Sequence, residues 1–187
     1  MKRVLVLVAV LALAGFAVWI ASTSPHLASP DAAGAADAPA PPSEDDARAV
    51  PVPPDAVAME VLGITDGDTL RVRTGAGTTE NVRLVGIDTP EVHPVSECFG
   101  DEAEAELLHL APIGSTVRGA PDLEPYDRYG RTLLYLWNDD GVFLNLALVE
   151  GGFAEAIRVA PNDAWYDDLV AAEAAATRAG LGMWGAC

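Results

Sequence analysis

Apolar residues in this chain form one long amino-terminal run and, after a gap, a series of short runs separated by turn residues. The first run, Val4–Ile20, has no charged or polar side chain and directly follows Lys2 and Arg3. A basic start followed by an apolar run is typical of a secretory signal. The run is long for a cleaved signal and slightly short for a membrane span of about 20 residues. We therefore predict that residues 1–21 form a signal peptide or an N-terminal signal anchor.

Residues 22–55 separate this run from the rest of the chain and contain few large apolar side chains. They are rich in alanine, proline, serine and acidic residues. Such a segment cannot bury enough apolar surface to offset the entropy that ordering would cost. We therefore expect a disordered, fairly extended linker. From residue 56 to residue 187 the pattern changes to short strands and helices, and this length suits a single domain with its own core.

Short apolar runs bounded by turn residues predict five strands in this domain. The first two flank Asp66-Gly67, a dipeptide that favours a tight hairpin turn. The third ends before Pro90, because proline cannot donate a hydrogen bond to a strand partner. The predicted strands are Val57–Ile64, Thr69–Arg73, Val82–Ile87, Ser115–Gly119 and Thr132–Trp137.

Three helices are predicted between and after these strands. The first carries acidic residues in its first turns, where the helix dipole favours anions, and places Ala103, Leu107 and Leu110 on one face. The last is expected to have Asn162 as its N-terminal cap and Gly180 as its stop. The predicted helices are Gly100–Leu110, Leu144–Glu150 and Asp163–Ala179. Strands followed by interleaved helices indicate an α+β fold.

Charge distinguishes this domain from most proteins that act on nucleic acids. From residue 56 onward it has eight arginines, no lysine and 22 acidic residues, and the whole chain carries a net charge of −17. Nucleic-acid-binding proteins usually present a basic surface. Either a small positive site lies within a negative surface, or the chain does not act on nucleic acid. A salty habitat, where self-repulsion is screened, would also suit an acidic domain without lysine.

Two cysteines, Cys98 and Cys187, are the only ones in the chain. An even number of cysteines in an exported protein favours a disulfide. Such a bridge would close a loop of about 90 residues and contribute about 4–5 kcal/mol in the chain-entropy model. It would also hold a chain end that otherwise frays. Two free thiols are the alternative, while a metal site made only of cysteines needs more ligands than two.

Four polar clusters carry the candidate chemistry. Carboxylates in tight turns suit a hard divalent cation, and guanidinium groups bind phosphate through paired hydrogen bonds. Each cluster alone has a plain explanation as a turn, a surface arginine or a charged loop. A cation and two guanidiniums that meet at one phosphate would instead form a phosphodiester-cleaving site. The clusters are Asp66-Gly67-Asp68-Thr69, Arg83, Asp88-Thr89-Pro90-Glu91 and Asp127-Arg128-Tyr129-Gly130-Arg131.

In their order and local spacing these clusters resemble the staphylococcal nuclease (thermonuclease) family. The resemblance covers about Ala56 to Trp184 and implies a five-stranded OB-fold barrel with about three helices. It further implies a calcium-dependent nuclease that acts as a monomer on DNA or RNA and leaves the phosphate on the 3′ side. Together with the amino-terminal run, it predicts a homologue that is secreted or anchored on the outer face of the cytoplasmic membrane.

The resemblance also implies roles for particular residues. The implied ligands of Ca²⁺ are Asp68, Asp88 and the carbonyl of Thr89. The implied catalytic residues are Glu91, which orients or deprotonates the attacking water, and the phosphate-binding pair Arg83 and Arg131. The implied substrate-binding residues are Arg128, where the family commonly has lysine, and Tyr129.

The chain departs from the family at residues 153–161, which contain no tyrosine. In the family, tyrosines in this stretch pack on the terminal nucleotide, and each stacked base contributes about 1–3 kcal/mol. Two other functions remain open: a non-catalytic OB-fold module that binds nucleic acid or protein, and a tethered surface protein that uses the barrel as a scaffold. A non-catalytic module would be expected to lose carboxylates or arginines from the four clusters, yet none is missing here.

Overall fold

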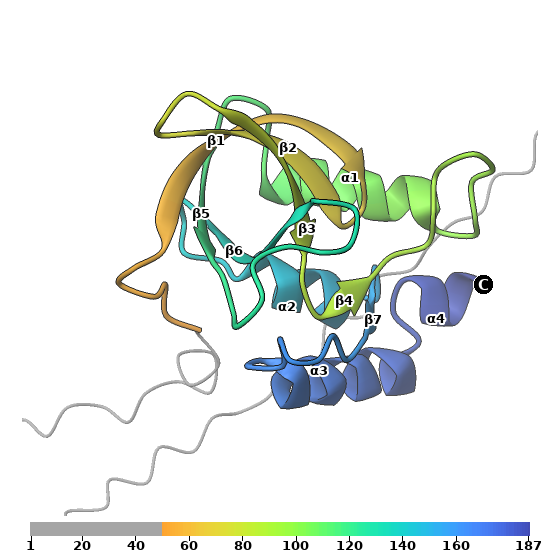
Figure 1. Cartoon of the computed structure of the whole chain (residues 1–187). Coiled ribbons are helices and arrows are strands. Elements are labelled where there is room, and N and C mark those ends of the chain that lie inside the picture. Colours follow the sequence, from red (N-terminus) through yellow and green to blue (C-terminus); the bar gives the residue numbers. More distant parts are fainter. Residues whose placement is uncertain (1–49) are drawn as a thin grey trace, which may run out of the picture. The chain divides into compact units, whose positions relative to one another are not determined.

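Five strands close into a barrel in the computed structural model, which describes residues 50–187 (Figure 1). Neighbours around the barrel follow the order β1-β2-β3-β6-β5, and only the β3–β6 pair is parallel. The α+β class and the five-stranded barrel predicted from the sequence are thereby confirmed. The barrel strands are β1 (Val57–Asp66), β2 (Thr69–Thr74), β3 (Thr79–Leu84), β5 (Thr116–Ala120) and β6 (Thr132–Asn138).

The helices lie outside the barrel, and α2 lies between the barrel and α3 (Figure 1). Two helices have the predicted bounds, and a four-residue helix near the carboxyl end adds to the predicted three. No helix within residues 50–187 is both long and apolar enough to cross a membrane. The helices are α1 (Gly100–Leu110), α2 (Leu144–Glu150), α3 (Tyr166–Ala179) and α4 (Met183–Ala186).

The start of α3 differs from the prediction. The helix begins after Trp165, and Asn162 does not cap it. The buried amide of Asn162 instead accepts a hydrogen bond from the Glu124 N–H and donates one to the Glu124 carbonyl, both at 2.7 Å. Two hydrogen bonds to the backbone of one residue satisfy both ends of the amide, whereas a cap would satisfy only its oxygen. At the other end, Gly180 ends the helix in a left-handed conformation, as predicted.

The predicted third strand is in fact two strands. β3 ends at Leu84, and after a turn at Gly86 the strand β4 (Ile87–Asp88) pairs with β7 (Glu155–Ala156), outside the barrel. Gly86 has a φ of +85°, and a Cβ there would lie 2.9 Å from the Leu169 side chain, so any other residue would be strained and crowded. Because the chain turns at Gly86, side chains at the end of β3 and in β4 can lie close together.

Two groups of buried side chains form the core. The first fills the barrel and continues to α1, α2 and α3, and the second combines three buried aromatic residues (Tyr135, Trp137 and Phe143) with Val85, Ala120 and Leu133. In the second group the Trp137 ring stacks on Phe143, with ring centroids 4.7 Å apart. The Trp137 indole N–H donates to the Val50 carbonyl at 3.0 Å, so the first described residues, which were assigned to the linker, contact the barrel. The predicted signal or anchor and residues 22–49 lie outside the described residues.

A disulfide joins Cys98, just before α1, to Cys187, the last residue of the chain. The Cα atoms of the two residues are 6.0 Å apart. Reduction by a dithiol is expected to lower the thermal midpoint by several degrees, because it restores conformational freedom to the unfolded chain. Calorimetry with and without the reductant measures this shift. An unchanged midpoint, or two titratable thiols in the oxidised protein, would contradict the pairing.

Candidate active site

The centre of the candidate site is the guanidinium of Arg83. Its neighbours on β3, Val82 and Leu84, have no exposed surface and point into the core, so alternation along the strand turns Arg83 toward the opposite face. Its Nη2 donates to Asp88 Oδ1 at 2.6 Å and forms an ion pair with Asp68 Oδ2 at 2.8 Å, and its Nη1 donates to the Leu84 carbonyl at 2.8 Å. One nitrogen atom therefore bridges the two predicted calcium-binding carboxylates.

Asp68 lies in the turn between β1 and β2 and is buried. Its Oδ2 accepts the Thr89 N–H at 3.2 Å, and its Oδ1 accepts the Thr69 hydroxyl at 3.0 Å. Burial raises the pKa of Asp68 to about 7; Arg83 opposes this rise, and the negative charge of Asp66 adds to it. One buried guanidinium thus compensates the charge of this carboxylate only in part.

Close packing of two turns places Asp68 beside Thr89. A Cβ on Gly67 would lie 2.9 Å from the Thr89 Oγ1 and 2.8 Å from the Ala103 Cβ of α1, distances too short for any side chain. Glycine is therefore required where the turn meets both the β4 loop and α1. The Asp-Gly pair, which the sequence identified only as a hairpin signal, also allows the two predicted ligand loops to approach each other.

Arg131 is held by Asp127, in a turn at the start of β6. Asp127 Oδ2 accepts from Arg131 Nε at 2.7 Å, and Oδ1 accepts from the backbone N–H groups of Tyr129 and Arg131, both at 2.9 Å. Burial acts to raise the pKa of Asp127, but these hydrogen bonds, led by the Arg131 side chain, hold it below its usual value. The carboxylate therefore stays charged and keeps the Arg131 side chain in one orientation.

Thr69 connects the two halves of the site. Its hydroxyl donates to Asp68 and accepts from Arg131 Nη1 at 3.5 Å, a long contact. Strand register creates the connection, because Thr69 of β2 lies opposite Arg83 of β3. Sequence reasoning assigns no role to Thr69 or Asp127 beyond membership of a cluster, although the spacing of four residues between Asp127 and Arg131 is a signal for a local ion pair.

The predicted substrate-binding residues lie on the surface beside Arg131. Tyr129 is 70% exposed, and the guanidinium carbons of Arg128 and Arg131 lie 4.7 Å and 5.7 Å from its ring centroid. Arg128 Nη2 also donates to the Tyr129 hydroxyl at 2.6 Å. The pair is therefore continuous with Arg131 and open to solvent, as a contact to a polymeric substrate requires.

Glu91 is the one predicted catalytic residue outside this network. It lies two residues after Thr89, and its side chain is exposed. Its carboxylate makes no hydrogen bond to any residue between 50 and 187, and only its backbone N–H and carbonyl are held, both by Glu97. The structure thus places Glu91 on the loop that leaves the site, with its carboxylate unpaired within the described chain.

The donor atoms at the centre of the site fit a hard divalent cation. Asp68 and Asp88 each place one oxygen against Arg83 Nη2, so the two carboxylates lie close together, and Asp66 adds negative charge nearby. Calcium takes six to eight oxygen ligands, so water would supply most of the shell around two carboxylates and the Thr89 carbonyl. Among residues 50–187 there is no cluster of three or more His, Cys, Asp or Glu side chains arranged to hold a metal. Within the described residues, a cation at this site would therefore have the smaller predicted ligand set of two carboxylates and the Thr89 carbonyl.

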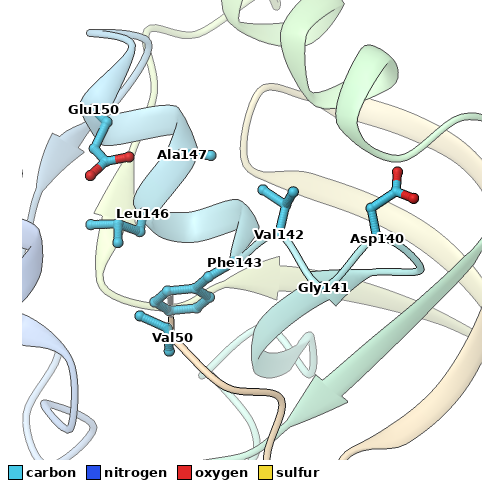
Figure 2. Close-up of a pocket in the computed structure, with 8 residues that line it drawn as sticks. All are labelled: Val50, Asp140, Gly141, Val142, Phe143, Leu146, Ala147 and Glu150. Atoms are coloured by element: carbon cyan, nitrogen blue, oxygen red, sulfur yellow. The ribbon is translucent and has the colours of Figure 1, made fainter. Parts of the chain in front are cut away.

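A separate pocket lies at the start of α2, and none of the predicted site residues lines it. Figure 2 shows the ring of Phe143 close to Val50 within this pocket. Its charged lining residues, Asp140 and Glu150, are both acidic, so it does not resemble a site for a phosphate group.

Comparison with known proteins places the chain in a family. The family described as staphylococcal nuclease homologue matches residues 81–186. The chain is 34% identical to the thermonuclease of Staphylococcus intermedius over 131 residues, which cover 66% of this chain and 74% of the relative. It is 32% identical to the thermonuclease of Staphylococcus hyicus over 129 residues, covering 67% and 74%. It is 36% identical to an uncharacterized endonuclease of Haemophilus influenzae over 124 residues, covering 66% and 64%. On these matches, and on the barrel and site described above, the chain belongs to the staphylococcal nuclease family.

Proposed function

We propose that the protein is a calcium-dependent nuclease that hydrolyses phosphodiester bonds in DNA or RNA and leaves the phosphate on the 3′ side. The observation that carries the proposal is the network of one ion pair and two hydrogen bonds that connects Arg83 to Arg131 through Asp68 and Thr69. The relatives named as thermonucleases and endonucleases support the same reaction.

The two arginines would hold the scissile phosphate. A guanidinium has five N–H donors, and neither Arg83 nor Arg131 directs all of them to acceptors within residues 50–187. The free N–H groups can bind the non-bridging phosphate oxygens, whose charge grows as the nucleophile attacks. Because Asp68, Asp88 and Asp127 already fix the guanidiniums, little reorganisation is needed in the transition state.

Asp68, Asp88 and the Thr89 carbonyl would hold the calcium ion beside the phosphate. Bound calcium would supply positive charge to a phosphoryl oxygen and a position for the attacking water. Glu91, with its unpaired carboxylate on the adjoining loop, would accept the proton of that water. The leaving 5′ oxygen then separates from a phosphate that remains on the 3′ side of the preceding nucleotide.

We further propose that the protein acts as an exported monomer, either secreted or tethered by residues 1–21. The apolar Val4–Ile20 run after Lys2 and Arg3 supports export. The acidic, proline-rich stretch of residues 22–55 supports a spacer between a tether and the domain.

The test incubates the purified protein with 5′-labelled single-stranded DNA and RNA of equal length in Ca²⁺. We expect shortened products whose 3′ ends accept nucleotides from a polymerase only after phosphatase treatment. Binding without cleavage, measured by fluorescence anisotropy on the same substrates, would support the non-catalytic module instead. If the protein neither cleaves nor binds these substrates, the interaction scaffold is the remaining function.

The acidic surface predicts an unusual dependence on salt. Repulsion between the protein and a polyanionic substrate extends over about 30 Å at 0.01 M salt but about 10 Å at 0.1 M. Added salt should first screen this repulsion and only later weaken the short-range contacts of Arg83, Arg128 and Arg131. We expect kcat/KM to rise from very low to moderate salt and then to fall, at fixed saturating Ca²⁺. A steady fall from the lowest salt would show that the acidic surface does not affect encounter.

A further inference from the structure

The backbone of Glu91 is held by a single residue, Glu97. The Glu91 N–H donates to Glu97 Oε2 at 3.1 Å, and the Glu91 carbonyl accepts the Glu97 N–H at 2.8 Å. Both polar groups of the Glu91 peptide are therefore tied to one residue six positions along the chain. The loop of residues 91–97 closes on itself at the point where the proposed proton acceptor lies.

Burial contributes little to the position of this loop. Residues 93–97 are all exposed, and Val95 is 76% exposed. The loop must be held at its ends, because it has no apolar anchor in the core. At the amino end Thr89 is buried against Asp68, while at the carboxyl end the next residue after Glu97 is Cys98.

The disulfide at Cys98 connects this loop to a well-anchored part of the fold. Its partner, Cys187, follows α4, where the side chain of Met183 is buried and its N–H donates to the Gly152 carbonyl at 2.9 Å. On the loop side, a Cβ on Gly100 would lie 2.7 Å from the Glu91 carbonyl oxygen. The start of α1 thus packs directly against Glu91, next to the covalent link.

We propose that Glu97 and the Cys98–Cys187 disulfide position Glu91 for its role in the reaction. The inference rests on the proposed nuclease function and adds two positioning elements to it. Neither Glu97 nor the disulfide touches the substrate: Glu97 fixes the Glu91 peptide, and the disulfide fixes the segment that carries Glu97. A base displaced by about 1 Å can lose about 10²-fold in rate, so even a small movement of this loop should lower kcat.

The link is also open to chemical control. Cys98 and Cys187 are both exposed, so a dithiol can reach the bond. Thiol–disulfide exchange breaks the S–S bond, gives two protein thiols and oxidises the dithiol to its cyclic disulfide, so the electrons and protons balance. The reduced protein keeps every arginine and carboxylate of the site, but its Glu91 loop loses its covalent link and keeps only non-covalent contacts, such as those of Glu97 and the Ser96 hydroxyl, which donates to Asp101 at 3.0 Å.

The first test compares Glu97→Ala with Glu97→Gln. Glutamine retains an oxygen that can accept the Glu91 N–H, whereas alanine does not. We expect kcat to fall about 10-fold or more in Glu97→Ala with KM unchanged, and to stay near the wild-type value in Glu97→Gln. The matched control is Glu102→Ala, which removes another exposed carboxylate just after the loop. Equal activity in Glu97→Ala and wild type, or a change confined to KM, would overturn the role of Glu97.

The second test compares oxidised protein, reduced protein and the Cys98→Ser, Cys187→Ser double variant, well below the thermal midpoint. We expect kcat to fall about 10-fold without the disulfide, while far-UV circular dichroism stays unchanged. Hydrogen exchange should become faster at the amides of residues 91–98 and stay the same in the barrel strands. Equal kcat and equal exchange in the three forms would overturn the inference. Absence of cleavage by the oxidised wild type would overturn the proposed function itself and this inference with it.

Discussion

Chelation of divalent cations is expected to abolish phosphodiester cleavage by the oxidised, folded protein. Asp68 and Asp88 lie close together, each with one oxygen against Arg83 Nη2, so without a cation the two carboxylates would repel the phosphate. A bound metal contributes several kcal/mol to transition-state stabilisation, and a loss of about 4 kcal/mol corresponds to about 10³-fold in rate. The measurement is the initial rate on single-stranded DNA in Ca²⁺ and in excess chelator.

Two controls test whether the lost rate is due to removal of the cation. Addition of excess Ca²⁺ after the chelator should restore the rate, and circular dichroism should show the same fold in both conditions. Asp88→Asn should raise the Ca²⁺ concentration required for half-maximal rate, because it removes one negative ligand. Full turnover in excess chelator would exclude the metal from the reaction.

Replacement of either site arginine by alanine is expected to lower the rate by about 10²-fold or more, the usual loss when one oxyanion-type donor is removed. Arg83 is expected to act mainly on kcat, because its buried guanidinium is fixed by Asp68 and Asp88 before substrate binds. Arg131 should affect both kcat and KM, because it also lies beside the exposed Tyr129. Single-turnover rates at saturating substrate separate the two effects.

Arg118→Ala is the matched control for these variants. Arg118 is an exposed arginine on β5, so its removal changes the net charge by the same amount and leaves the site intact. Loss of Arg83 also leaves Asp68 buried without its ion-pair partner, which destabilises the fold, so thermal midpoints must accompany the rates. Wild-type rates in a folded Arg83→Ala or Arg131→Ala variant would remove that arginine from the site.

Local patterns were sufficient to predict most elements of the fold. The predicted bounds of α1 and α2 match to the residue, and four of the five barrel strands overlap the predicted ranges closely, whereas β3 begins at Thr79 and ends at Leu84. The errors occurred where a distant partner decides the structure. Asn162 binds the Glu124 peptide 38 residues away, and the turn at Gly86 separates β3 from β4, which pairs with β7. No pattern around either residue carries that information.

The same limit applies to the site. The order of its charged clusters identified the carboxylates and the arginines, because a family resemblance needs only residue types and spacing. The residues that hold those groups in place were not identified. Thr69 reaches Arg131, 62 residues later in the chain, only because β2, β3 and β6 are neighbours in the closed barrel. Glu97 contacts the Glu91 backbone, with its carboxylate on the Glu91 N–H and its own N–H on the Glu91 carbonyl, and bonds to backbone atoms leave no trace in the sequence.

The parallel pairing of β3 with β6 has a consequence for the chain during its synthesis. Val82 pairs with Thr132, so the barrel cannot close until β6 has left the ribosome, well after the carboxylate turns have been made. Pairings between distant segments form slowly, because the intervening chain must first be ordered. A nascent chain that ends before residue 131 carries Arg83, Asp68 and Asp88 but lacks Arg131, so the candidate site is completed only when the second half of the domain is made.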